Sequence, residues 1–271
     1  MLDNFAFGQY YPGTSVFHRM DPRMKIILLI LYIAGIFYAG TLPSFAVPLL
    51  FMVFSIHMAA VPLKMVFKSL KPLRYILIFT FVLNLFFLQG ERVLLDLGFA
   101  RITREGLVNA VLYALRLVFL VMGSSLLTLT TAPVPLTDGL ERLLSPLKAI
   151  RFPAHEMAMM MTIALRFIPT LLEETDKIMK AQSARGADFE SGNLIQRAKA
   201  MVPLLVPLFV SSFRRAGELA MAMEARCYHG GEGRTRLHVL KMARRDYIAL
   251  ALGIVMVALT VALSRLTAGL I

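Results

Sequence analysis

The sequence contains no tryptophan and one cysteine, Cys227, among its 271 residues. A single cysteine excludes a framework of disulfides within the chain and says little about the compartment. Charge is absent over a long stretch, because residues 26–63 include no Asp, Glu, Lys or Arg. The first 24 residues carry four charged side chains and no apolar core, so we expect no cleavable signal peptide.

Motifs for enzymatic chemistry are also missing. The chain has no glycine-rich phosphate loop with Lys-Ser/Thr, no HExxH and no GxSxG. Cys227 and His229 supply two potential ligands where zinc needs three or four. We therefore expect no catalytic residue, no metal site, no cofactor and no ATP bound by this chain itself.

The composition indicates a membrane protein. Hydrophobic residues make up 58% of the chain, above the roughly 45–50% of soluble domains. The net charge of +12 could suggest nucleic acid, but Lys and Arg are not interleaved with aromatics in a basic run. Positive loops on the cytoplasmic side of a membrane explain the charge better.

Apolar segments predict an all-α membrane protein with about five transmembrane helices. A spanning helix needs about 20 mainly apolar residues. Residues 26–63 can hold two such helices, divided by a turn at residues 40–43. Three more segments follow, at residues 75–90, about 107–131 and 247–264.

The positive charges predict the orientation. Lys and Arg number 24 on the side of the N-terminus and the long charged region, and 3 on the opposite side, namely Arg92, Arg101 and Arg104. The side with more Lys and Arg is normally cytoplasmic. We therefore expect a multi-pass membrane protein with a cytoplasmic N-terminus, a cytoplasmic charged region and an external C-terminus.

The region between the fourth and fifth spans is helical in pattern but too charged to cross a membrane. Apolar residues recur at helical spacing, which predicts three helices, at about residues 136–147, 155–185 and 194–226. Prolines 169, 203 and 207 are expected to kink the two long ones. The resulting domains are a cytoplasmic N-terminal segment (1–24), transmembrane helices 1–4 (25–132), a cytoplasmic module of three helices (133–245) and transmembrane helix 5 (246–271).

The two long helices of this module end alike. One closes with Ala184-Arg185-Gly186 and the other with Ala225-Arg226-Cys227. An arginine in a last turn followed by glycine is a common helix terminator, and for one helix this explanation suffices. Two such ends in one module favour docking instead, because the arginine fork pairs well with carboxylates or carbonyls of a partner.

Several motifs beside these ends point to a family. They are Gly8-Gln9-Tyr10-Tyr11-Pro12-Gly13, His18-Arg19-Met20-Asp21-Pro22-Arg23-Met24-Lys25, Ala164-Leu165-Arg166-Phe167-Ile168-Pro169-Thr170, Ala181 to Ala187, Arg214-Arg215-Ala216, Ala222 to Arg226 and Gly233-Arg234-Thr235. With these motifs the chain resembles the transmembrane T-components of energy-coupling factor (ECF) transporters, the ATP-driven vitamin and metal importers of prokaryotes. The resemblance runs from about residue 8 to residue 250.

The resemblance implies a role for each helix end. In that family the two arginines insert into grooves of two cytoplasmic ABC-type ATPase subunits, so Arg185 and Arg226 would be the coupling arginines. Further implied partners are a substrate-binding membrane subunit (the S-component), with several exchangeable ones possible, and membrane lipid. Cys227 departs from the family's usual glycine, and because a left-handed cap is harder for cysteine, the second end is expected to differ in shape.

Some alternatives stay open at this stage. The chain could be a dedicated T-component for cobalt, nickel or biotin, or, with less support, a self-contained secondary transporter. Arg116 could lie in a polar pathway or pair within the bundle. Arg166 is expected to brace the module, the acidic cluster near Glu174 to form a solvated face, and the many methionines either to fill a core or to form an adaptable surface.

Overall fold

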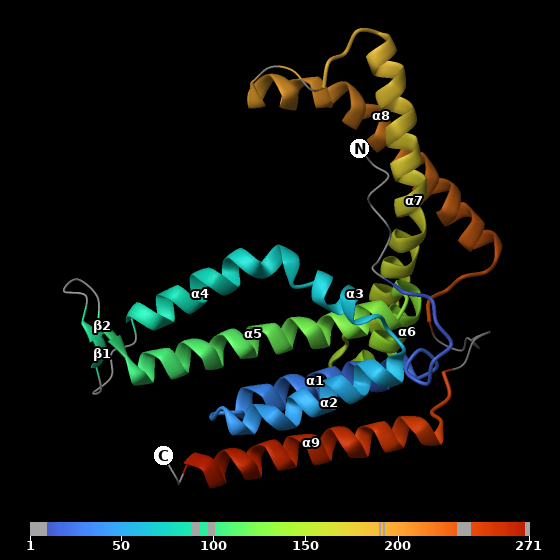
Figure 1. The fold of residues 1–271 in the computed structure, drawn as a ribbon. Coiled ribbons are helices and arrows are strands. Elements are labelled where there is room, and N and C mark those ends of the chain that lie inside the picture. The colour runs from blue at the N-terminus through green and yellow to red at the C-terminus, as the bar shows by residue number, and fades with distance from the viewer. Residues whose placement is uncertain are drawn as a thin grey trace. The chain divides into compact units, whose positions relative to one another are not determined.

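The computed structural model describes residues 10–87, 93–96, 101–189, 191, 193–231 and 240–268 (Figure 1). Within these ranges the chain forms two compact units. The bundle unit comprises residues 10–139 and 240–268, and the paired-helix unit comprises residues 140–231. Each is described by itself.

Helices dominate the bundle unit. Its α-helices are α1 (Pro22–Tyr38), α2 (Ala46–Ala59), α3 (Leu63–Lys68), α4 (Arg74–Phe87), α5 (Arg104–Thr130), the start of α6 (Pro133–Leu144) and α9 (Arg244–Ala268). Two short 3-10 turns, η2 (Pro43–Phe45) and η3 (Lys71–Leu73), precede α2 and α4. The predicted division of residues 26–63 is confirmed, because α1 ends at Tyr38 and η2 begins at Pro43.

A short pair of strands joins α4 to α5. Strand β1 (Val93–Asp96) pairs in antiparallel fashion with β2 (Arg101–Thr103), and Asp96 lies opposite Arg101. An all-α prediction misses this hairpin, since four- and three-residue strands leave little periodic signal. Residues 88–92, where the third predicted span ends, lie outside the described part of the chain.

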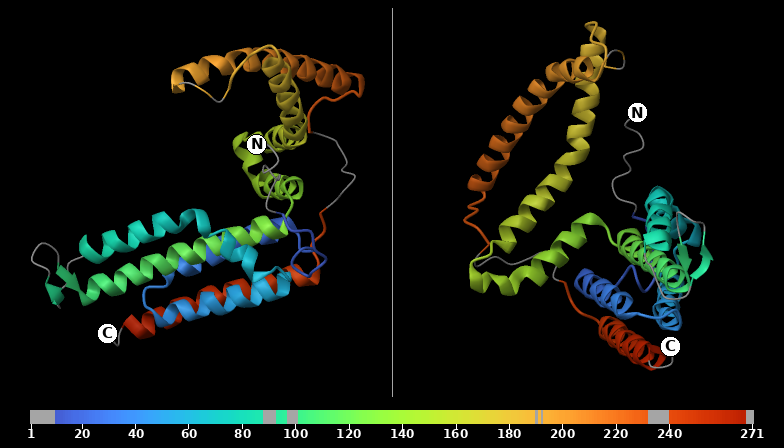
Figure 2. Two further views of the ribbon diagram at one scale, coloured as in Figure 1. Left: turned by 45° about the horizontal axis from the view of Figure 1, so that its top comes forward. Right: turned by 90° about the vertical axis from the view of Figure 1, so that its left-hand side faces the viewer.

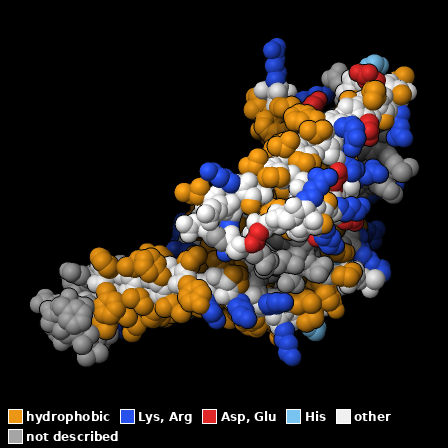
Figure 3. Space-filling view, turned by 90° about the horizontal axis from the view of Figure 1, so that it is seen from above, with side chains coloured by type: hydrophobic (Ala, Val, Ile, Leu, Met, Phe, Trp, Pro, Cys, Tyr) orange, Lys and Arg blue, Asp and Glu red, His pale blue; other side chains and the backbone are white. Residues whose placement is uncertain are grey.

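Among the residues that the structure describes, three helical stretches are long and apolar enough to cross a membrane, namely Leu63–Phe87, Arg104–Thr130 and Arg244–Thr267. Helices α1 and α2 have 17 and 14 residues, slightly short of the usual length of about 20. The membrane character of the chain follows from the three long stretches, while the total of five spans stays a prediction. Hydrophobic side chains cover the exposed face of α4 (Figure 3).

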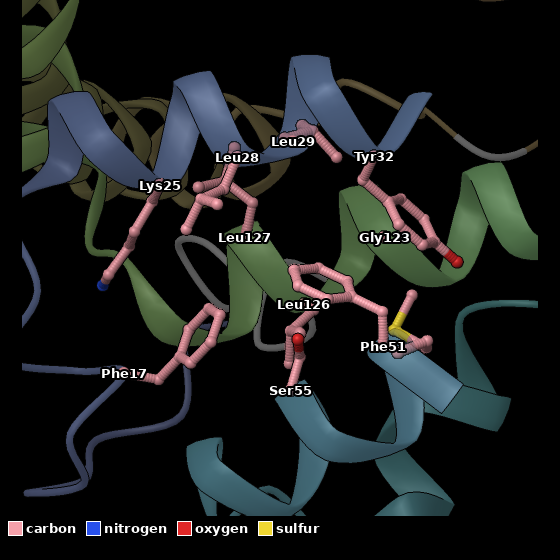
Figure 4. A pocket seen from close by; sticks show the side chains of 11 residues that line it. Phe17, Lys25, Leu28, Leu29, Tyr32, Phe51, Ser55, Gly123, Leu126 and Leu127 are labelled. Carbon is pink, nitrogen blue, oxygen red and sulfur yellow. The ribbon is translucent and has the colours of Figure 1, made fainter. Parts of the chain in front are cut away.

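The core of the bundle unit lies among α1, α2, α5 and α9, which run side by side (Figure 2). Its most buried side chains include Ile36, Met52 and Met256, from α1, α2 and α9. Helices α1 and α5 approach closely at Gly123 on α5, where an added Cβ would stand 2.7 Å from the ring of Tyr32 on α1. An apolar cavity between α1, α2 and α5 adjoins this contact (Figure 4).

The N-terminal motif holds the helix ends of the bundle unit together. Lys25, which is 3% exposed, donates from Nζ to the Thr130 carbonyl at 2.9 Å and to Thr131 Oγ1 at 3.0 Å. The Asp21 amide donates to Asp246 Oδ1 at 3.1 Å, at the start of α9. The motif therefore joins the beginning of α1 to the end of α5 and the beginning of α9.

Asp21 also begins α1. Its side chain accepts the Arg23 amide at 2.9 Å, and the Arg23 guanidinium approaches to 2.7 Å. Burial alone would raise the pKa of Asp21, but the side-chain and backbone hydrogen bonds from Arg23 hold that pKa below its ordinary value. Asp21 is thus kept as a charged N-cap, favourable at a helix N-terminus.

Arg116 pairs within the bundle. Its Nη2 donates to the carbonyl of Ala39, the C-cap of α1, at 3.0 Å. The guanidinium also lies 5.5 Å from the ring centroids of both Phe37 and Tyr113. Of the two alternatives, this geometry supports the structural one, in which arginine satisfies the end of a neighbouring helix.

Candidate functional site

The paired-helix unit is built on two long helices, α7 (Ala154–Ala184) and α8 (Leu194–Ala225). Both lie within one residue of their predicted bounds, and α6 begins and ends three residues earlier than predicted, followed by a 3-10 turn, η4 (Ser145–Ile150). Helices α7 and α8 continue through their internal prolines. Neither is among the helices apolar enough to span a membrane in the part of the chain that the structure describes.

The C-terminal ends of α7 and α8, which carry the two predicted triplets, have the same backbone hydrogen bonds. After α7, the Gly186 amide donates to Ser183 at 3.0 Å and the Ala187 amide to Gln182 at 3.0 Å. After α8, the Cys227 amide donates to Glu224 at 2.8 Å and the Tyr228 amide to Met223 at 3.0 Å. This 5→2 and 6→1 pattern is the Schellman motif of helix C-termini. We call these ends the first tip (Ala184–Gly186) and the second tip (Ala225–Cys227).

Cys227 occupies the position of Gly186 and adopts a similar conformation. Its φ is 54°, while that of Gly186 is 90°, so both are left-handed. The expectation that cysteine would give the second tip a different shape is therefore wrong for the backbone. The Schellman hydrogen bonds and the exposed position of the side chain allow cysteine to take this conformation, at a cost of about 1 kcal/mol relative to glycine.

Both tip arginines are available to a partner. Every residue of the two tips is exposed. Within the described ranges, neither the Arg185 nor the Arg226 guanidinium has a hydrogen-bond or ion-pair partner. An unpaired guanidinium offers five donors in a planar fork, suited to a carboxylate or to several carbonyl oxygens.

The two tips lie at opposite ends of α7. Arg185 follows its last residue, whereas Tyr228, two residues after Arg226, lies 3.3 Å from His155 at the beginning of α7. A helix of 31 residues is about 45 Å long at 1.5 Å per residue. The tips are therefore far enough apart to meet two separate protein surfaces.

Glu174 joins the two long helices near their middles. Its Oε1 accepts from Ser211 Oγ at 2.5 Å and its Oε2 from Arg215 Nη2 at 2.6 Å. The Ser211 hydrogen bond is the main cause that lowers the pKa of Glu174, burial opposes it, and Arg215 lowers it further. A charged Glu174 thus fixes where α8 crosses α7.

This contact revises two expectations about the module. Asp176 and Lys180 do form the expected i, i+4 pair, at 2.7 Å, but Glu174 points to α8 and is not part of a solvated face. Arg166 is exposed and has no partner within the described ranges, so the bracing role expected for it belongs to Arg215. A contact between residues 41 positions apart leaves no signal in a single sequence.

A wide apolar surface also covers this unit. Met160 and Met221 are 59% and 63% exposed, so of the two alternatives for the methionines an adaptable surface fits these two better than a core. Helix α8 adds exposed side chains, among them Phe209, Val210 and Phe213. Apolar surface of this extent normally marks an interaction site.

No group of three or more His, Cys, Asp or Glu side chains that could hold a metal occurs in the described residues. Two parts of the motifs shared with the T-components, Gly8-Gln9 and Gly233-Arg234-Thr235, lie outside the described residues. The described site consists of the two exposed arginine tips and the two helices that carry them. The Glu174 contact joins these helices, and an apolar surface lies along them between the tips.

Comparison with known proteins gives a consistent result. The sequence profile of the cobalt transport protein family (CbiQ) matches residues 13–237. A Clostridium kluyveri protein named "Energy-coupling factor transporter transmembrane protein EcfT" is 54% identical over 267 residues, covering 98% of each chain. Proteins of that name from Acidaminococcus fermentans and Bacillus subtilis are 53% and 48% identical, covering 100% and 96% of this chain and 99% and 98% of their own length.

Proposed function

Because the chain belongs to the cobalt transport protein (CbiQ) family, as a transmembrane component of an ECF transporter, we propose that Arg185 and Arg226 dock into two ATPase subunits. ATP binding would bring these subunits together and move the two tips with them. Helices α7 and α8 would transmit the movement to a substrate-binding S-component. The chain itself would bind no nucleotide and catalyse no reaction.

The similarity of the two tips is the observation that carries this proposal. Each presents an exposed, unpaired arginine on the same helix-ending motif, and the two tips lie at opposite ends of a helix of 31 residues. Equivalent tips suit two related partners. The Glu174 contact, which joins the helices between the tips, would make the pair move as one body.

The apolar surface of α8 fits the second part of the mechanism. Phe209, Val210 and Phe213 are 61%, 64% and 75% exposed, so they need a partner or lipid to cover them. We propose that this face binds the S-component. The module would lie on the cytoplasmic side, and its many Lys and Arg residues support this orientation.

The test is to replace the arginines in the assembled transporter. Arg185→Ala with Arg226→Ala should abolish or strongly reduce both ATPase association and substrate uptake in reconstituted vesicles. Arg197→Ala is the matched control, since Arg197 is an exposed arginine of α8 that belongs to neither tip. Intact uptake and intact association in the double variant would refute the coupling role.

A dedicated transporter for one substrate is the alternative that a specific observation favours. The family is described as one of cobalt transport proteins, whereas the names of the similar proteins mention no substrate. Identification of co-purified partners by mass spectrometry would distinguish the two. A single S-component indicates a dedicated transporter, and several different ones indicate a shared component.

A further inference from the structure

A chain of hydrogen bonds connects the segment after the second tip to α6 and α7. Tyr228 Oη lies 3.3 Å from His155 Nε2, and His155 Nδ1 lies 3.0 Å from Glu141 Oε1. A carboxylate only accepts hydrogen bonds, so Nδ1 donates to Glu141, and in this tautomer Nε2 can accept a hydrogen bond from the Tyr228 hydroxyl. The three side chains come from α6, from the first turn of α7 and from just beyond α8.

Close packing reinforces this connection. A Cβ added at Gly231 would stand 2.4 Å from the His155 ring, which is too close for any side chain unless the ring moves. The backbone at Gly231 therefore lies directly against the imidazole. The segment from Tyr228 to Gly231 is held at two points, by a hydrogen bond and by contact with the ring.

The first tip has a different environment. A Cβ added at Gly186 would meet no atom within 4 Å. Ser191 hydrogen-bonds Asp188 at 3.1 Å, which is a contact within the same loop. In the part of this loop that the structure describes, no side-chain hydrogen bond ties residues 184–187 to another helix. The two tips share a backbone motif but differ in how firmly they are anchored.

We propose that Glu141, His155 and Tyr228 form a positioning relay that fixes the second tip, and with it Arg226, to the beginning of α7. This inference rests on the docking role proposed for Arg226. The relay gives the second tip a set direction before a partner arrives, so less ordering is needed on binding. The first tip adapts to its partner, and the second holds its partner in a set orientation relative to α6.

The first experiment combines relay and tip variants in the full chain, reconstituted with its S-component and titrated with the ATPase subunits. Tyr228→Phe removes one hydroxyl, and we expect about two- to tenfold weaker association, as for the loss of one hydrogen bond. The same loss should appear in an Arg185→Ala background. In an Arg226→Ala background Tyr228→Phe should have no further effect, because the relay acts through Arg226.

Tyr38→Phe is the matched control, since Tyr38 is 63% exposed and belongs to the bundle unit. Gly231→Ala tests the relay without removing a polar group, because its methyl group must displace the His155 ring, and it should reproduce the Tyr228→Phe defect. An Arg226→Ala variant with unchanged association would refute the docking role. If Arg226→Ala weakens association as expected, and Tyr228→Phe then weakens it further by the same factor in the Arg226→Ala background, the relay is refuted and the docking role is not.

The second experiment measures the position of the tip directly. Cys227 is the only cysteine of the chain and is exposed, so a nitroxide label can be attached there. Tyr228→Phe should increase the mobility of this label in electron paramagnetic resonance spectra. In a chain with Cys227→Gly and Gly186→Cys, the label on the first tip should be unaffected by Tyr228→Phe. Unchanged mobility at Cys227 would overturn the proposal whatever the association data show.

Discussion

Arg215 on α8 approaches Glu174 on α7 with an Nη2–Oε2 distance of 2.6 Å. The side chains are 36% and 21% exposed, so the pair lies at the edge of the helix contact. Ser211, which is 5% exposed, completes the contact from α8. This carboxylate therefore contributes to holding α7 and α8 together between the two tips.

Removal of Arg215 should loosen the helix pair. We expect Arg215→Ala to lower the free energy of unfolding of the paired-helix unit by about 1 kcal/mol, which is less than the roughly 1.5–3 kcal/mol of a hydrogen bond to a charged group, because solvent screens the pair. Hydrogen exchange of the α8 amides in the full chain measures this. Asp176→Asn is the control, since it breaks an exposed pair within one helix and should change stability by less than about 0.5 kcal/mol. Equal effects of the two substitutions would contradict the role of Glu174.

The Glu174 contact should depend on pH in a defined direction. Because the pKa of Glu174 is lowered in the folded chain, its charged form contributes stability above the ordinary glutamate pKa of about 4.3. That contribution is lost as the pH falls through the lowered folded-state pKa. Thermal unfolding of Glu174→Gln and the parent chain should therefore differ at neutral pH and converge in acid. A difference that grows in acid would have the wrong sign.

The buried Lys25 should be essential for the bundle unit. Lys25→Met retains most of the apolar stem but leaves the Thr130 carbonyl and Thr131 Oγ1 without this donor. We expect a loss of about 2–3 kcal/mol, as for a hydrogen-bonded charge, seen as a lower unfolding temperature in detergent. Lys64→Met changes an exposed lysine and should have little effect. A stable Lys25→Met chain would show that the N-terminal motif does not hold the helix ends.

The two tips should respond differently to alanine. Gly186→Ala places a side chain at a φ of 90° and should destabilise the end of α7 by about 1 kcal/mol. Cys227→Ala should be nearly neutral, because cysteine already carries the left-handed strain at a φ of 54°. Hydrogen exchange of the amides in the last turns of α7 and α8 distinguishes the two. Equal protection losses at both tips would contradict this account of Cys227.

Local pattern predicted much of this structure. The uncharged run at residues 26–63, the helical periodicity and the helix-ending triplets located the long helices, and α7 and α8 begin and end within one residue of the prediction. The positions of Arg185 and Arg226 at helix ends were likewise visible in the sequence. These features depend on neighbouring residues, so a single sequence contains the information.

Contacts between distant residues were not predictable in this way. Glu174 looked like part of a solvated face, and only the crossing of α8 brings Ser211 and Arg215 to it. His155 and Tyr228 are 73 positions apart, and neither belongs to a motif with a fixed spacing. Residue type sets only a preference for the conformation at Cys227, and the Schellman hydrogen bonds override that preference.

Cross-linking from the tips tests the central claim most directly. In the assembled transporter, a short photoactivatable reagent on Cys227 should form a covalent link to one ATPase subunit. The same reagent on Gly186→Cys, in a chain that also carries Cys227→Gly, should link to the other. Specific links from each tip to a different ATPase subunit are the predicted result. Links from both tips to lipid or to the S-component, with none to an ATPase subunit, would contradict the account.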